Sequence, residues 1–533
     1  MSHPARTNRS LLSCTVVFIF ALVVCFAMFP AGTGEAAQAL FHWITRILGA
    51  PLQVLTFVIV LLLLFLAAGK YGNIRLGSED PEYSTFSWVS MMICCGISSA
   101  MLFWAFTDWA FDFEARKAVV FLGVSSPYET GTAFTFFHWG VSTWAIYCVS
   151  GLPIAYYLHV KRHKGLSLSA ICMAASADRG GRKARKAVSA VIDVLFLFTC
   201  CTGISVALGL SVPMLTRLTA LVFGLPVSFT LDIGIIFLIS AVFTISSYIG
   251  LASGMQKLSR FCVRLVILFV LLVFICGPTL FLMKSTVNAA GMALQNFVRL
   301  SLWTDPVAGG GLPEKWTVWY WLYDWSFTPF VGLFVAKISR GRTIRAVIVN
   351  MLAGGTLGLF VVFGVLSHYS VAAELNGLVD VTGLVDAGRM SQAIVDVLQT
   401  LPSPWLFSAL FGLAAVLLLV TSLDSAAYTM SSTLTRNLAA DAHPNRHLRM
   451  ICCLLLVSVP ITMLLGDASL ETLKTCAIIS GVPLCMVLCS LVYAFLRTIL
   501  RDFGSMNAEA IKNPGRVRES APGAVSHEPW AES

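Results

Sequence analysis

The chain has 533 residues, of which 57% are hydrophobic and only 12% are charged, and its mean hydropathy is +0.82. So apolar a composition excludes a soluble multidomain protein and predicts a polytopic membrane protein. The formal net charge of +9 does not indicate a nucleic-acid partner, because the basic residues gather in alternate loops between apolar stretches.

Twelve apolar stretches are long enough to cross a bilayer. They cover residues 11–31, 51–69, 87–108, 133–158, 188–211, 230–252, 262–283, 316–337, 344–367, 404–432, 449–466 and 474–498. Basic residues concentrate in the loops at 161–186, 257–260, 337–345 and 436–449, whereas the opposite loops are acidic. By the positive-inside rule, the basic loops and both termini are expected in the cytoplasm.

The third and fourth stretches carry aromatic residues that are candidates for a binding site. Trp144 and Tyr147 lie three residues apart and share a helix face, whereas Trp139 fits that face less well. Trp104 lies in the third stretch, and Asp108 is expected to be solvated at its outer edge. Most of the fifteen cysteines lie inside apolar stretches and indicate core packing, so no metal site is predicted.

Three segments outside the apolar stretches have distinct patterns. Residues 285–303 and 386–400 are amphipathic and predict helices lying at the outer face, either as links between halves or as interfacial anchors. After Arg501 the chain is rich in Pro, Gly and Ala and is expected to be disordered.

The eighth stretch is unusual for its aromatic density. Aromatic residues that only anchor a helix gather at its ends, whereas these run through about three turns. They are Trp316, Trp319, Tyr320, Trp321, Tyr323, Trp325, Phe327 and Phe330, with Asp324 and Pro329 among them. Because π faces attract cations that cannot donate hydrogen bonds, this segment predicts a site for a quaternary ammonium group.

Three motifs resemble the betaine/carnitine/choline transporter family. They are PFVGLFVAKISRGR from Pro329, FHWGVSTWAIY from Phe137 to Tyr147, and TSLDSAA from Thr421 to Ala427. Helices of matching number and spacing extend the resemblance over about residues 10 to 500. Some members of this family carry a long basic tail for osmotic sensing, and this tail does not resemble one.

The resemblance implies an all-α polytopic fold of twelve transmembrane helices, ten of them in an inverted, LeuT-like 5+5 repeat. It also implies a homotrimer in the bacterial cytoplasmic (inner) membrane. The expected parts are a cytoplasmic N-terminus (1–10), two helices outside the repeat (11–86), a first repeat (87–283), an external amphipathic helix and loop (284–315), a second repeat (316–500) and a disordered cytoplasmic tail (501–533).

Two of the repeat's corresponding stretches carry helix-breaking residues at their middle. These are CGISSAM at 95–101 in the third stretch and SFTPFVG at 326–332 in the eighth. Paired interruptions of this kind point to a binding site at the membrane midplane. We therefore expect both spans to be interrupted there.

By resemblance, the substrate-binding residues are expected on the third, fourth and eighth stretches. They are Trp104, Trp139, Trp144, Tyr147, Trp321, Tyr323, Asp324 and Phe327. The family usually has tryptophan where this chain has Asp324, and a buried carboxylate must be paired, protonated or hydrated. Three interpretations remain open: Asp324 binds a cationic substrate, it takes up and releases a proton, or it forms a fixed ion pair with an arginine such as Arg264.

Ion coupling is also left open by the sequence. Thr421 and Ser422 match one sodium site of the family, since hydroxyl oxygens are the hard ligands that Na⁺ requires. The threonines of a second site align with Cys200 and Ile204, which offer no such ligand, and Arg264 falls within one residue of the arginine that replaces sodium in exchangers. Two-sodium coupling is therefore not expected, whereas coupling to Na⁺ or H⁺ and substrate exchange remain alternatives.

The sequence as a whole predicts a secondary active transporter for small quaternary or tertiary ammonium compounds such as betaine, choline, carnitine or a methylated amine. One alternative is a sodium-independent exchanger of the same family. A second alternative is a receptor or channel on the same scaffold, although no soluble signalling domain or continuous polar stripe is evident. No nucleotide-binding P-loop and no paired nucleophile and base are present, so neither a pump nor an enzyme is expected, and no cofactor is implied.

Overall fold

The computed structural model describes residues 6–97, 100–111, 126–163, 167–175, 181–249, 252–307, 309–436, 438, 443–465 and 470–512. Its first half contains β1 (Arg6–Thr7), α1 (Arg9–Met28), α2 (Pro30–Ala68), η1 (Lys70–Asn73), α3 (Thr85–Ile97), α4 (Ala100–Thr107), η2 (Asp108–Ala110), α6 (Pro127–His138), α7 (Val141–Ala155), η4 (Tyr156–Val160), α8 (Leu168–Ala175), α9 (Arg182–Phe223), α10 (Phe229–Ile249) and α11 (Ala252–Cys276).

The second half contains α12 (Thr279–Gln295), α13 (Phe297–Leu302), η5 (Pro313–Val318), α14 (Trp319–Ile338), α15 (Ile344–Val349), η6 (Asn350–Gly355), α16 (Thr356–Leu375), α17 (Val381–Asp386), α18 (Met390–Gln399), α19 (Pro404–Thr433), β2 (Thr435–Arg436), α20 (Arg446–Leu465), α21 (Leu470–Phe503) and α22 (Ala508–Lys512).

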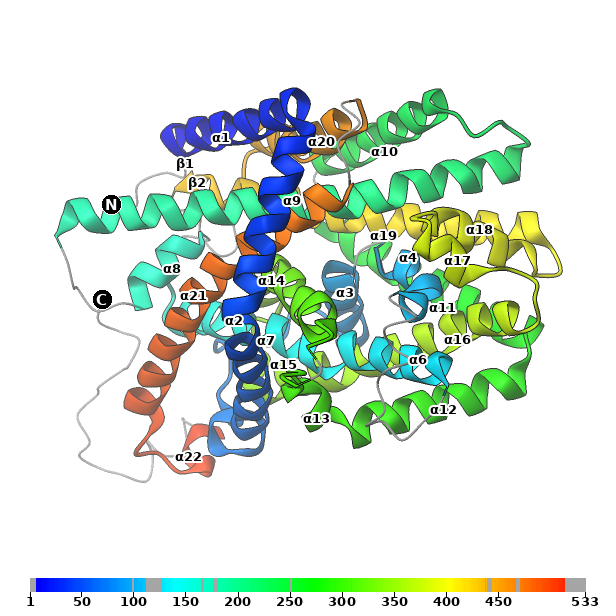
Figure 1. The fold of residues 1–533 in the computed structure, drawn as a ribbon. Coiled ribbons are helices and arrows are strands. Elements are labelled where there is room, and N and C mark those ends of the chain that lie inside the picture. The colour runs from blue at the N-terminus through cyan, green and yellow to red at the C-terminus, as the bar shows by residue number, and fades with distance from the viewer. Residues whose placement is uncertain are drawn as a thin grey trace, which may run out of the picture.

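The molecule is almost entirely helical, as Figure 1 shows. Among the described residues, eight helices are long and apolar enough to cross a membrane, and a ninth is added if the bent α3–α4 pair counts as one span. Each of the twelve predicted stretches overlaps a helix of the structure. The chain is therefore a polytopic membrane protein, because only such helices satisfy their own backbone groups in lipid.

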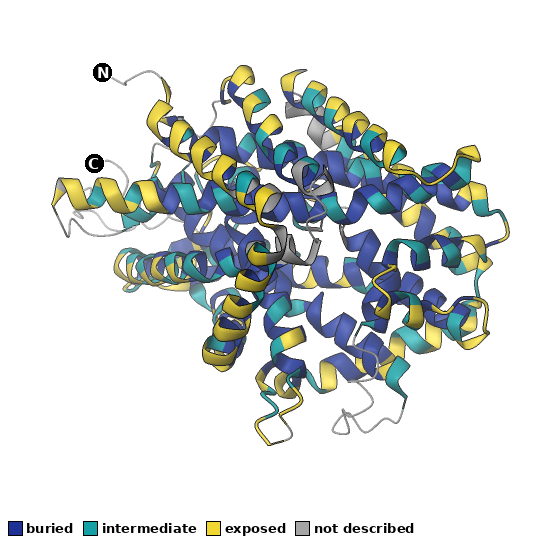
Figure 2. Ribbon diagram, turned by 45° about the horizontal axis from the view of Figure 1, so that its top comes forward, coloured by how far each residue is buried: buried dark blue, intermediate teal, exposed yellow. Residues whose placement is uncertain are grey.

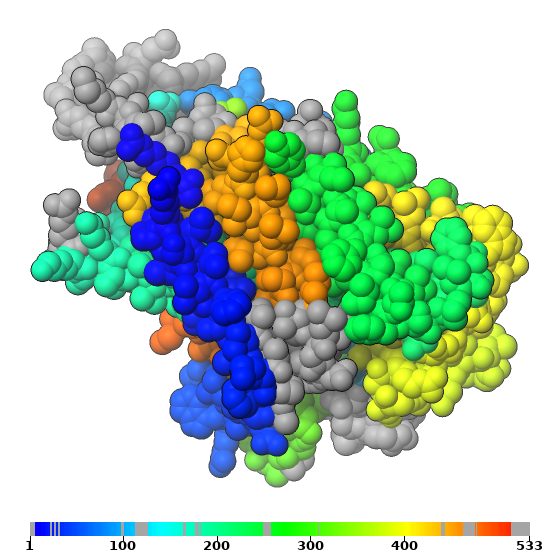
Figure 3. All heavy atoms as spheres, turned by 90° about the horizontal axis from the view of Figure 1, so that it is seen from above, coloured from blue at the N-terminus to red at the C-terminus, as the bar shows by residue number. Residues whose placement is uncertain are grey.

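Helix α14 lies at the centre of the bundle. It packs against α7, α21, α9 and α3, and all of its residues from 320 to 336, together with Ile338, are buried. Figure 2 shows the contrast between the buried centre of the bundle and the exposed faces of the peripheral helices, which carry many large apolar side chains. At the periphery, α20 packs against both α1 and α10, and these three lie side by side on the face seen in Figure 3.

The ends of several helices meet at one face of the bundle. The Lys161 ammonium, after η4, lies 2.8 Å from the Asp502 carboxylate at the end of α21, and Tyr156 also donates to Asp502. Lys70, after α2, donates to the carbonyls of Gly504 and Met506. The segment after α14 joins the same face, because the Arg342 carbonyl accepts from the Leu76 backbone.

The C-terminal segment differs from the expected disorder after Arg501. Helix α21 continues to Phe503, and α22 follows at Ala508–Lys512 with Ile511 buried. The contacts of Lys70 and Lys161 explain why this segment is ordered. The rest of the predicted disordered tail, from residue 513, lies outside the described residues.

The two amphipathic segments are helical, as predicted. Residues 285–303 fall in α12 and α13, and residues 386–400 fall at the end of α17 and in α18. The N-terminal strand β1 pairs antiparallel with β2, which follows α19. This pairing attaches the start of the chain to the end of α19.

The expected pair of interrupted spans is only half present. Helices α3 and α4 are separate, and their axes bend by 70°. By contrast, α14 runs unbroken from Trp319 to Ile338 with Pro329 inside it, so the predicted interruption of the eighth stretch is wrong. The Thr328 hydroxyl donates a hydrogen bond to the backbone carbonyl of Asp324, and the Ser150 hydroxyl donates one to the backbone carbonyl of Thr328. These bonds offset part of the backbone hydrogen bonding that the helix loses at Pro329.

The contact between α7 and α14 depends on glycine at a close approach. A Cβ atom added to Gly332 would lie 2.3 Å from the Ser150 hydroxyl oxygen and 3.2 Å from the Gly151 backbone nitrogen. We expect Gly332→Ala to destabilise the protein by about 1–3 kcal/mol, the usual cost of overpacking, and to lower the apparent melting temperature of the detergent-purified protein.

The matched control is Gly234→Ala in α10, where an added Cβ atom has nothing within 4 Å. This variant is expected to melt at the wild-type temperature or slightly above it, because alanine favours a helix. Equal melting temperatures for both variants would contradict the proposed role of the close α7–α14 contact.

Candidate functional site

One face of α14 carries a continuous row of aromatic rings. Trp319 and Tyr323 stack with centroids 5.6 Å apart, and Tyr323 contacts Phe327 at 5.0 Å. These side chains share a face because residues three and four apart lie one above the other on a helix. Phe327 points at α9, where a Cβ atom on Gly203 would come within 3.3 Å of its ring.

Helix α7 supplies the facing pair, Trp144 and Tyr147. Their rings meet edge to face at 6.0 Å. A Cβ atom at Gly96 of α3 would lie 3.5 Å from the Trp144 ring and 3.6 Å from the Tyr147 ring. A Cβ atom at Gly355 of η6 would lie only 2.3 Å from the Trp144 indole. Two glycines on different elements therefore leave the space that this indole occupies.

The Asp324 carboxylate connects the two aromatic groups. It is 2% exposed, and it accepts hydrogen bonds from the Thr143 hydroxyl at 2.6 Å and from the Tyr147 phenol at 3.0 Å. Both donors lie four residues apart on α7. The carboxylate is thus held between α7 and α14 in the middle of the bundle, next to Tyr147 and Tyr323.

The hydrogen bonds around Thr143 suit both protonation states of Asp324. The Thr143 hydroxyl also lies 2.5 Å from the His138 carbonyl oxygen, yet a hydroxyl has only one proton to donate. An ionised Asp324 would take that proton, whereas a protonated Asp324 would donate to Thr143 and leave it free to donate to His138. The arrangement can therefore follow a change of protonation by reorienting one hydroxyl.

Arg264 does not pair with Asp324. Among the described ion pairs none joins these two residues, and the Arg264 side chain is exposed. Helix α11, which carries Arg264, packs mainly against α19, α3 and α16. Of the three open interpretations, the fixed ion pair with Arg264 is therefore not the one seen, because hydroxyl donors contact this carboxylate.

Two of the predicted aromatic residues lie in a separate group, which we call the Tyr320 cluster. Its members are Trp104, Phe111, Trp139, Trp316, Trp319 and Tyr320, with His138 stacked on Tyr320 at 4.8 Å. Trp104 and Trp139 contact Tyr320 at 6.3 and 5.6 Å. Because Trp319 also stacks on Tyr323, the cluster continues directly from the row on α14.

Asp108 belongs to this cluster and is not solvated. It is fully buried, and Tyr320 donates a hydrogen bond to it. The expectation of a hydrated carboxylate at the outer edge is wrong, because the aromatic rings of η5 and α14 fold over this end of α4. His138 is hydrogen-bonded to Thr317 at 3.0 Å.

Trp321 lies away from both groups. It comes two residues before Tyr323, about 200° around the helix. Its ring packs against Phe137 of α6 at 6.0 Å. The structure therefore does not place Trp321 on the face of Tyr323 and Phe327, although it lies one helical turn before Asp324.

Thr421 and Ser422 lie on the buried face of α19, next to α3. The Ser422 hydroxyl lies 3.1 Å from the Cys94 carbonyl of α3 and 3.0 Å from the Leu418 carbonyl. Thr421 donates to Leu418 at 2.8 Å. Both protons point to carbonyls, so the hydroxyl oxygens keep their lone pairs as hard ligands. Among the described residues no cluster of three His, Cys, Asp or Glu side chains forms a metal site.

Sequence reasoning missed Thr143 and the glycines that make room for the rings. Thr143 had a signal, because it lies one turn before Tyr147 and shares its face. Gly96, Gly203 and Gly355 had none, because a glycine's close approach to a ring on another helix depends on how the helices pack.

Comparison with known proteins gives a consistent picture. The model of the BCCT, betaine/carnitine/choline family transporter, matches residues 10–503. The uncharacterized transporter YeaV of Escherichia coli is 36% identical over 452 residues, which is 85% of this chain and 93% of that protein. The carnitine transporter of Acinetobacter baumannii is 33% identical, covering 96% of this chain and 92% of its own length.

A more distant relative is the ectoine/hydroxyectoine transporter of Virgibacillus pantothenticus. It is 29% identical over 520 residues, covering 96% of this chain and 100% of its own length. All three relatives match over nearly their full length, so the similarity includes every element of the candidate site.

The hydroxyl donors to Asp324 provide a direct test of the site's geometry. Thr143→Val removes a donor to a buried carboxylate at nearly constant volume and should destabilise the protein by about 1.5–3 kcal/mol, as measured by thermal or denaturant unfolding. Thr429→Val on α19 is the control, since that hydroxyl bonds only to a carbonyl of its own helix and its loss should cost less.

The same Thr143→Val substitution made in an Asp324→Asn background should cost clearly less, because the charge that the hydroxyl stabilises is gone. An equal loss in both backgrounds would show that Thr143 acts independently of Asp324.

Proposed function

Because the chain belongs to the betaine/carnitine/choline transporter family, we propose that it is a secondary active transporter for small ammonium compounds that uses alternating access. Family membership makes it a transporter of a small-molecule substrate and not an enzyme. The observation that carries the proposal is the buried Asp324 carboxylate, which is bonded to Tyr147 and adjacent to Tyr323, with Trp144 against Tyr147. An anionic group among aromatic faces suits an organic cation.

The substrate site in this proposal uses the residues that converge on Asp324. They are Trp144, Tyr147, Tyr323 and Phe327, with Thr143 as a new member. Trp104 and Trp139 of the Tyr320 cluster would line the path next to this site. Trp321, whose ring packs against Phe137, would act through packing.

The membrane arrangement is proposed from the predicted stretches and the charge pattern. Twelve spans, with ten in an inverted 5+5 repeat, would account for the helices that overlap all twelve stretches. The face where Lys70, Lys161 and Asp502 meet carries basic loops, and the positive-inside rule would make it cytoplasmic, with both termini on that side of a bacterial inner membrane. A homotrimer is proposed by analogy with the family.

Three coupling modes follow from the residues present. Thr421 and Ser422, beside the Cys94 carbonyl, would hold one Na⁺. Asp324, with its switchable Thr143 hydroxyl, would carry a proton. Arg264 would substitute for sodium in an exchanger, a role to which its exposed position in this structure lends no support. Of these three, the network around Asp324 gives most support to proton coupling.

The function is tested by uptake into proteoliposomes of labelled glycine betaine, choline, carnitine and ectoine. We expect saturable uptake of at least one compound, driven by a Na⁺ gradient, a pH gradient or preloaded substrate. Gly355→Ala should weaken apparent affinity about tenfold, because the Trp144 indole must move. Gly354→Ala, where an added Cβ atom has nothing within 4 Å, should behave like wild type. Absence of saturable flux for every compound would defeat the proposal.

The charge of Asp324 predicts a preference among substrates. A zwitterion such as glycine betaine has its cation attracted and its carboxylate repelled, whereas choline suffers no repulsion. We therefore expect net cations to be preferred, and Asp324→Asn to weaken their apparent affinity by about 1–3 kcal/mol, the scale of a desolvated cation contact.

Competition assays across the four compounds measure this preference, with and without a pH gradient. If Asp324 instead carries the coupled proton, Asp324→Asn abolishes dependence on the pH gradient and leaves counterflow exchange intact. Unchanged substrate ranking, affinity and pH response would make Asp324 a purely structural residue.

A further inference from the structure

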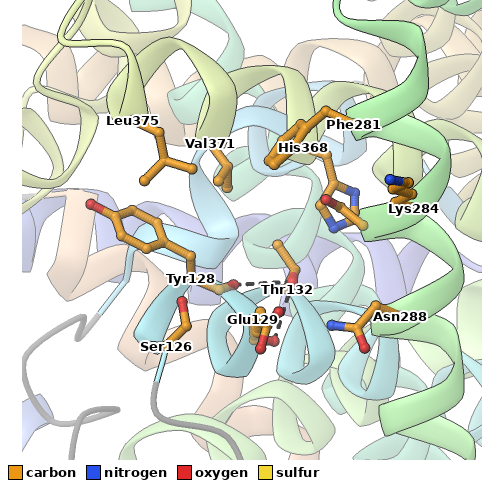
Figure 4. A pocket seen from close by; sticks show the side chains of 11 residues that line it. Ser126, Tyr128, Glu129, Thr132, Phe281, Lys284, Asn288, His368, Val371 and Leu375 are labelled. Atoms are coloured by element: carbon orange, nitrogen blue, oxygen red, sulfur yellow. Dashed lines mark hydrogen bonds between the residues drawn. The ribbon is translucent and has the colours of Figure 1, made fainter.

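A pocket lies away from the residues proposed to bind the transported substrate. Its volume is about 440 Å³, and it opens between α6, α12 and α16 (Figure 4). It is lined by Ser126, Tyr128, Glu129, Thr132, Phe281, Lys284, Ser285, Asn288, His368, Val371 and Leu375. None of these residues contributes to the Asp324 site or to the Tyr320 cluster, and the volume suits a small polar ligand.

The pocket brings together two opposite charges that are not paired with each other. Glu129 on α6 and Lys284 on α12 both line it. Neither takes part in an ion pair among the described residues. Asn288 lies one helical turn after Lys284 and adds an amide on the same side, as Figure 4 shows. A ligand with an anionic and a cationic end could therefore contact both charges.

His368 adds a polar atom that lacks a partner. The ring is 2% exposed, and its Nδ1 lies 2.7 Å from the Gly364 carbonyl oxygen, to which it can only donate. In the neutral ring the Nε2 is then an acceptor, and it has no hydrogen-bond partner in the structure. A ligand that satisfies Nε2 must donate a hydrogen bond, which a trimethylammonium group cannot do.

The position of the pocket suits the interface between lipid and water. It lies where α6 begins and where α16 ends, so it is at the rim of the membrane-spanning region. The adjoining helix α12 exposes large apolar side chains along one face, namely Leu280, Met283, Val287 and Leu294. Such a face contacts acyl chains while Lys284 and Asn288 remain at headgroup level.

We propose that this pocket binds a zwitterion that combines an anionic group with a primary ammonium, as in phosphoethanolamine. The anionic group contacts Lys284 and Asn288. The ammonium lies near Glu129 and donates one hydrogen bond to the His368 Nε2. The same chemistry is available from a phospholipid headgroup and from a free solute. The site prefers a primary ammonium to a trimethylammonium group, whereas a box of aromatic rings prefers the trimethylammonium group.

The soluble arm of the test uses glycerophosphoethanolamine and the detergent-purified full-length protein. Its melting temperature should rise saturably with this compound. Glycerophosphocholine, which differs only by three methyl groups, should need about tenfold higher concentration. Lys284→Gln and Glu129→Gln, both at exposed positions, should each weaken binding of glycerophosphoethanolamine about tenfold. The control is Lys315→Gln, which changes an exposed lysine on η5 outside the pocket and should leave binding unchanged.

The lipid arm uses nanodiscs that contain either phosphatidylethanolamine or phosphatidylcholine with the same acyl chains. A higher melting temperature in phosphatidylethanolamine, lost in Lys284→Gln and Glu129→Gln, identifies the headgroup as the source. A response in the soluble arm alone identifies a free solute. The proposal is overturned if neither arm separates ammonium from trimethylammonium, or if both variants respond like Lys315→Gln. Neither arm measures transport, so the result is independent of the transported substrate.

Discussion

The hydrogen bonds from α7 to the Asp324 carboxylate are the interaction on which the rest of the centre depends. A carboxylate with no partner in the interior of a membrane protein would cost several kcal/mol. Thr143 and Tyr147 offset that cost with two charge-assisted hydrogen bonds. The same bonds fix how α7 and α14 face each other, and so they place Tyr147 against Asp324.

Close packing around this pair requires small residues. Gly332 lets α14 approach α7 at Ser150, and Gly96, Gly203 and Gly355 make room for the rings of Trp144, Tyr147 and Phe327. Membrane helices gain little from the hydrophobic effect when they associate, so contact through small residues and interhelical hydrogen bonds determines their arrangement. Aromatic bulk on one helix is thus matched by glycine on its neighbour.

The molecule presents two kinds of polar site with different chemistry. Around Asp324, hydroxyl donors and π faces surround a charge in the buried centre. In the pocket of Glu129, Lys284 and His368, opposite charges and a free imidazole nitrogen lie at the membrane rim. If both proposals hold, a methylated cation suits the first site and a hydrogen-bond-donating cation suits the second, and the property that separates the two ligands is the presence of N–H.

The sequence alone determined the membrane class, the positions of the apolar helices and the family, because hydropathy and motifs are local properties of the chain. It also marked Trp144, Tyr147, Tyr323, Asp324 and Phe327 as candidates, since helical spacing and resemblance both indicate them. Helical spacing placed Thr143 on the face of Tyr147, but the sequence did not tell whether α7 with Thr143 or α11 with Arg264 contacts Asp324, because that depends on which helices pack together.

Tertiary structure also decided three local outcomes that the residue types left open. Proline usually interrupts a helix, yet α14 is continuous at Pro329, where the hydroxyls of Thr328 and Ser150 bond nearby backbone carbonyls. Asp108 sits at the end of α4, yet aromatic rings from a distant segment bury it. Ser150 beside Pro329, Tyr320 on Asp108, and Lys70 and Lys161 on residues 502–512 all come from distant parts of the chain. Local sequence cannot specify such contacts, because they exist only once the helices have packed.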